Sequence, residues 1–369
     1  MPNFDLSGIA LSMVCPTNKL ITDDKGLPGA YVYRPKKMLS ELISGGSASI
    51  VHPAFMVCDV QQEGIYFGKY QGMVHNNRVY SLPCEDPAAN IDLDTFAAYC
   101  RNKGRGHHCI TAAEWGYLAL LAKKLGRQPK GNNDYGKDHT ETSRIAIPTY
   151  TYAESGTTKI GRVATGTGPL TWSDTGNLDG IFDLNGNVHE WILDVRLVKG
   201  ELQVIPYNNA ASPNVDASAA SGAWRALNAT ATSYADLFVV PNGQGTTAGT
   251  VKLDFVSSHW QWGVSITSLS DTNRYAAFAA TTCVGISAFC KAYMQALALC
   301  PEDGAAAEDY NGDGFWANNG ADERCAFRGG SWSDGAGSGV FCLDFRWPRS
   351  SVNADVGGRP AYVKLGTEN

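Results

Sequence analysis

The sequence predicts an α+β fold in which short antiparallel strands are combined with two or three helices and long loops. Short β-branched or aromatic runs lie between polar turns, as strands do. Helix-start residues are followed by a glycine stop at helical distance. The 40 glycines among 369 residues indicate many turns rather than a helical bundle, and 44% hydrophobic with 18% charged residues is an ordinary globular composition.

The strand signals begin after a weakly patterned stretch. Residues 1–52 carry no clear period, and we interpret them as an N-terminal segment that acts as an attachment arm. Residues 53–58 (Pro-Ala-Phe-Met-Val-Cys) and 64–70 (Gly-Ile-Tyr-Phe-Gly-Lys-Tyr) are rich in apolar and aromatic side chains and are bounded by polar turns. Both runs are predicted to be strands.

Three segments predict helices. Residues 91–104 end at a glycine, and residues 286–299 end before Pro301. The strongest signal is the helix that follows Thr111, because Glu114 stands three residues later and completes a capping box. This helix is expected to stop at Gly126, whereas the Gly-, Thr- and Ser-rich residues 127–180 read as long loops.

Charge and cysteine content exclude several classes of protein. The net charge is −6 without a Lys/Arg run, which argues against a nucleic-acid partner. No apolar stretch is long enough to span a bilayer, and the first residues lack a signal-peptide pattern, so we expect a protein made in the cytoplasm without membrane insertion. The ten cysteines form no C-x-x-C pair and are expected to be mostly buried free thiols.

Three segments, in order, resemble motifs of the formylglycine-generating-enzyme family, which has a C-type-lectin-like fold. They are Thr-Ala-Ala-Glu-Trp at 111–115, Gly-Ile-Phe-Asp-Leu-Asn-Gly-Asn-Val-His-Glu-Trp at 180–191, and Phe-Arg-Gly-Gly-Ser-Trp at 327–332, which closes with Gly-Gly-Arg-Pro-Ala at 357–361. The resemblance implies a lectin-like domain over residues 53–365 with an insertion at about 200–305.

Within that family the chain is most similar to the variable proteins of diversity-generating retroelements, which share stretches like residues 75–83 and 162–168. The resemblance implies a non-catalytic, hypervariable ligand-binding protein. It would be encoded by a phage or prophage, would recognise a bacterial surface molecule, and would lie in a tail-associated position on the virion or on the bacterial cell surface. Its variable segment would be residues 328–359. The ligand and the oligomeric state are not fixed by the sequence.

Two alternatives remain beside this interpretation. A copper oxidase of the formylglycine-generating type would need two cysteines just after the Arg-Gly-Gly-Ser motif, because the metal is bound by paired thiolates. Here Asp334 stands three residues beyond Ser331, Cys342 has no nearby partner in sequence, and Cys325 precedes the motif, so the oxidase is disfavoured. The other alternative is a structural virion or surface protein whose lectin-like face is unused.

The candidate ligand-binding positions follow from alternation along the C-terminal segment. In residues 340–347 the aromatic and apolar side chains at 341, 343, 345 and 347 alternate with Cys342, Asp344 and Arg346, which predicts a buried face and a solvent face. Adenine replacement in an Asn codon of the retroelement template could yield the polar or small residues but never Trp. The predicted binding positions are Ser331, Ser333, Asp334, Cys342, Asp344, Arg346, Ser351, Asn353, Ala354 and Asp355. A plain half-exposed sheet explains the same pattern without a ligand.

A structural cation is also expected near the second motif. Asp183 and Glu190 would supply carboxylates, and Gly186 and Val188 would supply backbone carbonyls, a hard oxygen set that suits Ca²⁺. The enzyme family places calcium at the matching positions. The alternative is that the two carboxylates only cap turns and accept loop amides.

Overall fold

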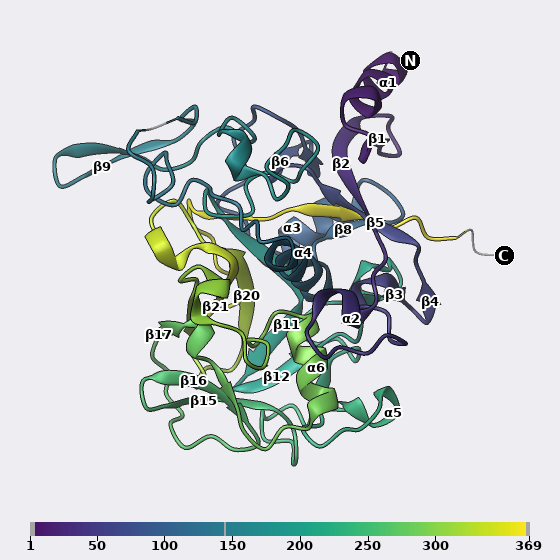
Figure 1. The fold of residues 1–369 in the computed structure, drawn as a ribbon, viewed down its shortest axis with the longest axis vertical. Coiled ribbons are helices and arrows are strands. Elements are labelled where there is room, and N and C mark those ends of the chain that lie inside the picture. Colours follow the sequence, from purple (N-terminus) through teal and green to yellow (C-terminus); the bar gives the residue numbers. More distant parts are fainter. Residues whose placement is uncertain (1–3, 144, 367–369) are drawn as a thin grey trace.

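The computed structural model describes residues 4–143 and 145–366, which form a mixed α+β structure built mostly of strands. The predicted fold class is confirmed at this level. Figure 1 shows two projections from the body, the N-terminal helix α1 and the hairpin that contains strand β9. The α-helices are α1 (Phe4–Val14), α2 (Leu39–Leu42), α3 (Leu93–Arg101), α4 (Ala112–Lys124), α5 (Tyr234–Leu237) and α6 (Ala288–Ala296).

A five-stranded sheet joins the N-terminal segment to the C terminus in the order β1-β2-β5-β23-β8. Because β2 pairs with β5 along its length, residues 18–35 belong to this sheet and are not a separate arm, contrary to the prediction for residues 1–52. The strands are β1 (Asn18–Thr22), β2 (Pro28–Pro35), β5 (Gly64–Gly68), β8 (His107–Cys109) and β23 (Pro360–Tyr362).

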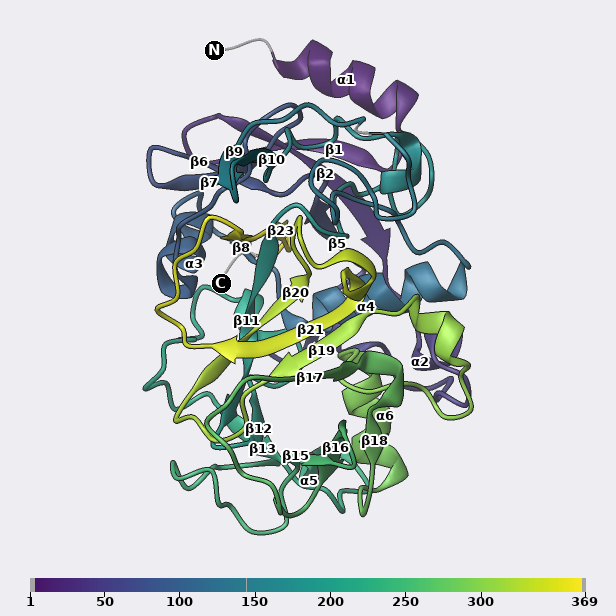
Figure 2. The same ribbon diagram turned by 90° about the vertical axis from the view of Figure 1, so that its left-hand side faces the viewer.

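The larger sheet runs β17-β19-β21-β20-β11-β12-β15-β16-β18, with β13, β14 and β22 at its sides (Figure 2). The residues expected to form an insertion at 200–305 extend this sheet from β12 onward. Its strands are β11 (His189–Val198), β12 (Glu201–Val204), β13 (Arg225–Leu227), β14 (Phe238–Val239), β15 (Lys252–Val256), β16 (His259–Gly263), β17 (Arg274–Ala277), β18 (Thr282–Cys283), β19 (Gly314–Ala317), β20 (Arg324–Gly329), β21 (Gly339–Trp347) and β22 (Val356–Gly357).

Small hairpins complete the strand inventory of the described residues. The predicted strand at 53–58 is instead a 3-10 turn over Pro53–Phe55 followed by a two-residue strand, because Pro53 starts a helical turn that His52 caps. The remaining pairs are β3 (Met56–Val57) with β4 (Val60–Gln61), β6 (Gly72–His75) with β7 (Arg78–Ser81), and β9 (Thr151–Glu154) with β10 (Thr157–Ile160).

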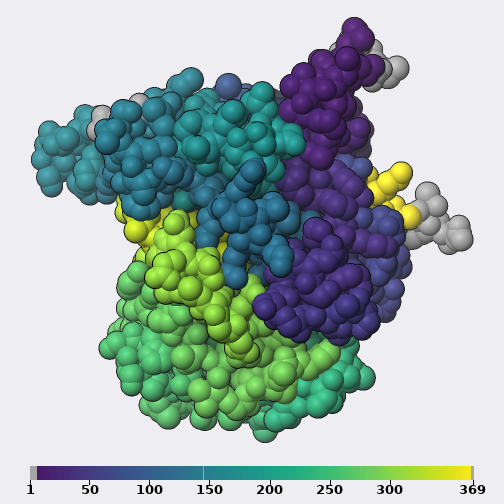
Figure 3. Space-filling view, viewed as in Figure 1, coloured from purple at the N-terminus to yellow at the C-terminus, as the bar shows by residue number. Residues whose placement is uncertain are grey.

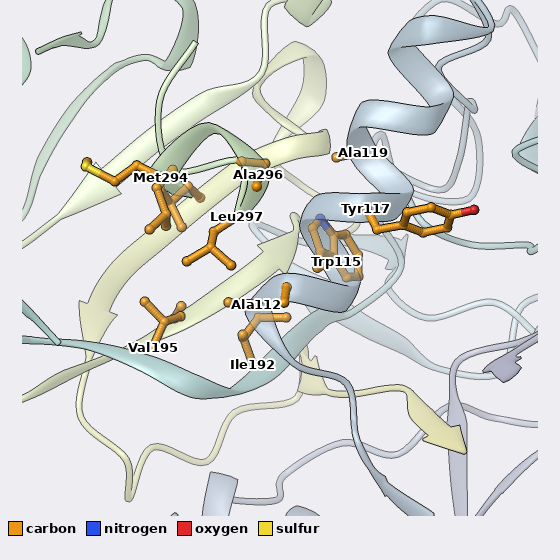
Figure 4. Packing of buried hydrophobic residues seen from close by; sticks show 14 of the residues in the cluster. Ala112, Trp115, Tyr117, Ala119, Ile192, Val195, Met294, Ala296 and Leu297 are labelled. Atoms are coloured by element: carbon orange, nitrogen blue, oxygen red, sulfur yellow. The ribbon is translucent and has the colours of Figure 1, made fainter. Parts of the chain in front are cut away.

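Helix α4 lies at the centre of the main core. Its predicted capping box is confirmed: the Glu114 amide donates to Thr111 Oγ1 at 3.2 Å, and the Thr111 amide donates to the Glu114 carboxylate at 3.1 Å. Trp115 is buried and donates its indole N–H to the Val340 carbonyl on β21 at 2.7 Å. Figure 4 shows Trp115 beside Leu297, which follows α6, with Ile192 of β11 close by. This core fixes the sheet on which the C-terminal segment lies.

Candidate functional site

The predicted solvent face of β21 is buried. Cys342 and Asp344 are each 0% exposed, and Ser331 at the start of the preceding loop is 1% exposed, so the prediction that these three side chains face solvent is wrong. The inner face behaves as predicted, since Phe341, Leu343 and Phe345 join the main core. Trp347, which was placed with the buried set, is only partly buried.

Large neighbours explain why the other face of β21 is covered. Phe327 of β20 and Trp316 of β19 both lie directly opposite Asp344 in the sheet register. The Arg346 side chain folds over the strand, and its Nε and Nη2 bind Asp344 Oδ2 at 2.9 and 2.6 Å. Rings and a guanidinium therefore shield the short side chains of β21, although the sequence alternates as a half-exposed strand would.

Exposed positions of the segment lie in two loops instead. In the first loop, residues 331–338, Ser333 is exposed and Asp334 is half-buried. In the second loop, residues 348–355, Asn353 is exposed, whereas Ser351, Ala354 and Asp355 are half-buried. Arg346 is also half-buried. The structure thus leaves seven of the ten predicted binding positions at least partly accessible.

Both loops are held by backbone hydrogen bonds to distant parts of the chain. The Tyr135 amide donates to the Trp332 carbonyl at 2.9 Å, and the Gly335 amide donates to the Asn133 carbonyl at 2.9 Å. In the second loop, the Asn90 amide donates to the Asn353 carbonyl at 2.8 Å. Because main-chain atoms make these contacts, they do not depend on which side chain each loop position carries.

His189 lies between the two loops. Its amide donates to the Asp355 carbonyl at 2.7 Å, and its Nε2 is 3.4 Å from Asp334 Oδ2. The ring is buried and stacks on Phe327 at 5.4 Å between centroids, while its Nδ1 has no hydrogen-bond partner among the described residues. His189 therefore links the first loop, the second loop and the sheet beneath them.

An aromatic group adjoins one end of the first loop. We call it the hairpin cluster; it comprises Trp332, Tyr150 and Tyr152, next to hairpin β9–β10. Tyr150 and Tyr152 are 5.9 and 6.4 Å from Trp332 between ring centroids, and both tyrosines are half-buried. Figure 3 shows the region around this hairpin overhanging the C-terminal part of the chain, drawn in yellow and light green.

A second aromatic group adjoins the other end. We call it the sheet cluster; it comprises Tyr275 of β17, Trp316 of β19 and Trp347 of β21. The Tyr275 and Trp316 rings are 4.8 Å apart, and the Arg346 guanidinium lies 5.4 Å from Trp316 and 5.9 Å from Trp347. Gly337 of the first loop lies against Trp316, since a Cβ added there would be 2.7 Å from the ring. The first loop thus runs from the hairpin cluster to the sheet cluster.

Of the four groups expected to bind calcium, three are already bound by two side chains of the protein, and the fourth, the Asp183 carboxylate, accepts the Gly166 amide at 2.8 Å. Arg359 donates to Glu190 Oε1 at 2.7 Å and Oε2 at 2.9 Å, and also to the Asp183 carbonyl at 3.1 Å. Gln71 Nε2 donates to the Gly186 and Val188 carbonyls at 3.2 and 3.0 Å. All the predicted ligand residues come together, but around a guanidinium and an amide.

This arrangement does not fit a bound Ca²⁺. A calcium ion needs six or more oxygens at 2.3–2.6 Å, whereas here the Glu190 carboxylate is fully engaged by Arg359. Burial raises the pKa of Asp183 to about 6, against the lowering effect of the Gly166 amide and of Arg359. Among residues 4–143 and 145–366, no group of three or more His, Cys, Asp or Glu side chains could hold a metal ion.

Sequence reasoning missed the two aromatic clusters and the role of Arg359. Tyr275 and Trp316 are ordinary strand residues in sequence, and only the sheet order places them beside the C-terminal segment. Arg359 belongs to the closing motif, and its positive charge was a signal that could have been paired with Glu190, 169 residues earlier in the chain. Nothing in the sequence marks Gln71.

Comparison with solved structures gives distant likenesses, including these two. The chain is similar to Treponema denticola variable protein 1 at 11% identity and a TM-score of 0.35, over 95% of this chain and 100% of that chain. It is also similar to PvdO from Pseudomonas aeruginosa at 20% identity and a TM-score of 0.26, over 48% of this chain and 74% of that chain. No protein-family model and no curated protein matches the sequence. At this level of overlap, neither likeness carries a function, which rests on the site itself.

No helix within the described residues is both long enough and apolar enough to cross a bilayer.

Proposed function

We propose that this protein is a non-catalytic ligand-binding protein whose binding surface consists of the loops 331–338 and 348–355 and the side chains beside them. The observation that carries the proposal is that these loops expose side chains while their main chains are fixed by hydrogen bonds to Tyr135, Asn133 and Asn90. A fixed backbone with accessible side chains allows the surface to change without a change of fold.

Diversification by a retroelement is part of the proposal. It rests on the motifs of residues 327–332 and 357–361, which bracket the segment, and on the predicted adenine-derived residue types within it. The ligand would be a bacterial surface molecule, and the protein would be displayed on a virion or on a cell surface. We propose no cofactor, since the residues expected to bind calcium are engaged by Arg359 and Gln71.

The non-catalytic part of the proposal is supported by the cysteines. Cys325 lies opposite Trp347 in the β20–β21 register, five residues along β21 from Cys342, a separation of about 16 Å along a strand. Two sulfurs that far apart cannot bind one copper ion. Burial and the nearby carboxylates of Asp334 and Asp313 raise the pKa of the Cys342 thiol well above its usual value, which keeps it protonated. No observation favours the oxidase.

The experiment that tests the proposal is sequencing of the flanking DNA in several isolates. A reverse-transcriptase gene and a near-identical repeat of the segment should lie nearby, and differences between isolates should fall at template adenines. We expect these differences at the codons of Ser333, Asp334 and Asn353, while the Trp332 codon stays constant. Isolates that differ evenly along the whole gene would contradict diversification. Copper-dependent oxidation of a cysteine peptide by the purified protein would contradict the non-catalytic proposal.

A further inference from the structure

We infer that the ligand surface extends beyond the variable segment onto Tyr275 and Trp316, which serve as fixed anchors, and that the partner is a protein segment rich in lysine and arginine. The inference rests on the proposed function, because it enlarges the same surface. Neither residue lies within residues 328–359, so rewriting of that segment would leave both unchanged.

The anchors are placed by the sheet order. Strands β17 and β19 lie beside β21, and the register sets Tyr275 opposite Trp316 and Trp316 opposite Asp344. The three side chains therefore share one face of the sheet, and Figure 2 shows β17, β19 and β21 adjacent on the side toward the viewer. Gly337 packs against the Trp316 ring, so the anchors and the first loop form a continuous surface.

The exposure of these rings indicates a binding role. Tyr275 is 50% exposed and Trp316 is half-buried, although each is large enough to have contributed to a core. Tyrosine, tryptophan and arginine are the residues most enriched among interface side chains that dominate binding energy. Serine, glycine and asparagine around rigid aromatic anchors are the composition of adaptable protein-binding surfaces, and Ser333, Gly337 and Asn353 supply them here.

Charge decides the chemistry of the partner. The cations at the edges of the surface are neutralised within the protein: Arg346 by Asp344 at 2.6 Å, Arg162 by Asp86 at 2.9 Å, and Lys159 by Glu154 at 2.5 Å.

The carboxylates of Asp334 and Asp355 have no Lys or Arg partner in the part of the chain that the structure describes. Asp355 makes no side-chain hydrogen bond or ion pair there, and Asp334 Oδ2 accepts the Ser331 amide at 2.7 Å and lies 3.4 Å from His189 Nε2. A negative surface with exposed aromatic rings attracts ammonium and guanidinium groups, through ion pairs and through contact with the ring faces. A basic protein segment matches both features, whereas a neutral polysaccharide matches only the rings.

The test uses the full chain and a library of short random peptides displayed on phage as the probe. Selection on the immobilised protein should enrich peptides that contain more lysine and arginine than the starting library, and added salt should weaken their binding. Tyr275→Ala and Trp316→Ala should each weaken the selected peptides by about tenfold or more, as expected for anchor residues. Asp355→Asn should weaken them less.

Matched controls separate local from general effects. Asp322→Asn removes a carboxylate whose side chain is 94% exposed elsewhere, and Val240→Ala shortens an apolar side chain that is 73% exposed; both should bind peptides like the parent protein. Thermal melts of every variant identify those that fail to fold. If Trp316→Ala unfolds, Tyr275→Ala alone decides the question, because half of its side chain already lies in solvent.

The outcomes distinguish this inference from the proposed function. Basic peptides that need Ser333 and Asn353 but bind equally well to Tyr275→Ala would overturn the anchors and leave the proposed function intact. Enrichment of acidic or neutral peptides, or binding to dextran beads without peptide enrichment, would overturn the partner chemistry. If the selected peptides bind equally well to the anchor variants and to the variant in which Ser333 and Asn353 are replaced, both proposals are overturned.

Discussion

The C-terminal segment contains two kinds of region that differ in what a substitution can change. Residues 339–345 of strand β21 are enclosed on both faces, and the segment begins and ends with the buried arginines Arg328 and Arg359, each 0% exposed. The two loops have accessible side chains and main chains held from outside the segment. The difference teaches that accessible and enclosed side chains are separated by loop against strand here, rather than by the two faces of one strand.

The largest effect should come from the buried arginine at the end of the segment. Arg359→Met leaves the buried Glu190 carboxylate without its cation and should cost about 3–5 kcal/mol of unfolding free energy. Denaturant unfolding measures this loss.

EDTA should leave the melting temperature of the parent protein unchanged, because Arg359 and Gln71 already bind the oxygens. A melting temperature that falls with EDTA and recovers with Ca²⁺ would show that an ion is needed after all.

Truncation of aromatic side chains on β21 should distinguish a core position from a partly buried position by the unfolding free energy that each variant loses. Phe345 is 0% exposed in the main core, so Phe345→Ala should cost about 3–5 kcal/mol. Trp347 is only partly buried, so Trp347→Ala should cost less than this range. Chemical denaturation of both variants gives the comparison. Equal losses would mean that Trp347 belongs to the enclosed region.

Replacement of Asp344 should lower the unfolding free energy, although the sequence alternation predicts this residue on the binding face. Asp344→Ala removes the acceptor of three Arg346 hydrogen bonds and of the Arg346 amide, and should cost about 1–3 kcal/mol. A double variant that also carries Arg346→Met should recover part of the loss, since no unpaired cation remains. A neutral single substitution would return Asp344 to the accessible positions.

Buried carboxylates of the framework should make stability depend on pH. Burial raises the pKa of Asp194 on β11 to about 8, with the Ala112 amide opposing the rise. Between about pH 4 and pH 8 the folded protein holds a proton on Asp194 that the unfolded chain has lost. The contribution of Asp194 to the unfolding free energy is therefore fully present below about pH 4 and is lost as the pH rises toward 8. Asp194→Asn should flatten the decline between pH 5 and 8, because the amide oxygen can still accept from Ala112. An unchanged pH profile would contradict the raised pKa.

The smallest effect is expected in the loops. Joint replacement of Ser333 and Asn353 should change the unfolding free energy by no more than about 0.5 kcal/mol, because their side chains are exposed and the loop hydrogen bonds come from main-chain atoms. Thermal melts beside the Phe345→Ala variant make the contrast visible. Loop variants that melt as early as the core variant would remove the distinction between the two regions.

Local signals predicted the elements better than the site. Helix α4 follows from the Thr111 and Glu114 pair, which act within one turn, and the structure confirms it. The exposure of β21 could not be predicted from its own alternation, because Phe327 and Trp316, which cover it, come from other strands. Likewise the motif around Asp183 and Glu190 predicts a calcium site, but the sequence could not show that the Arg359 guanidinium would bind the Glu190 carboxylate.

Strand β23 follows residues 328–359, the segment proposed to vary, and lies between β5 and β8 inside the five-stranded sheet. A premature stop codon or a frameshift anywhere in residues 328–359 would therefore delete an interior strand together with Arg359. Such a product would lack part of its fold, and cellular proteases would remove it. If a retroelement rewrites the segment as proposed, folding itself would screen out its errors, so that only full-length, in-frame variants would form the complete five-stranded sheet.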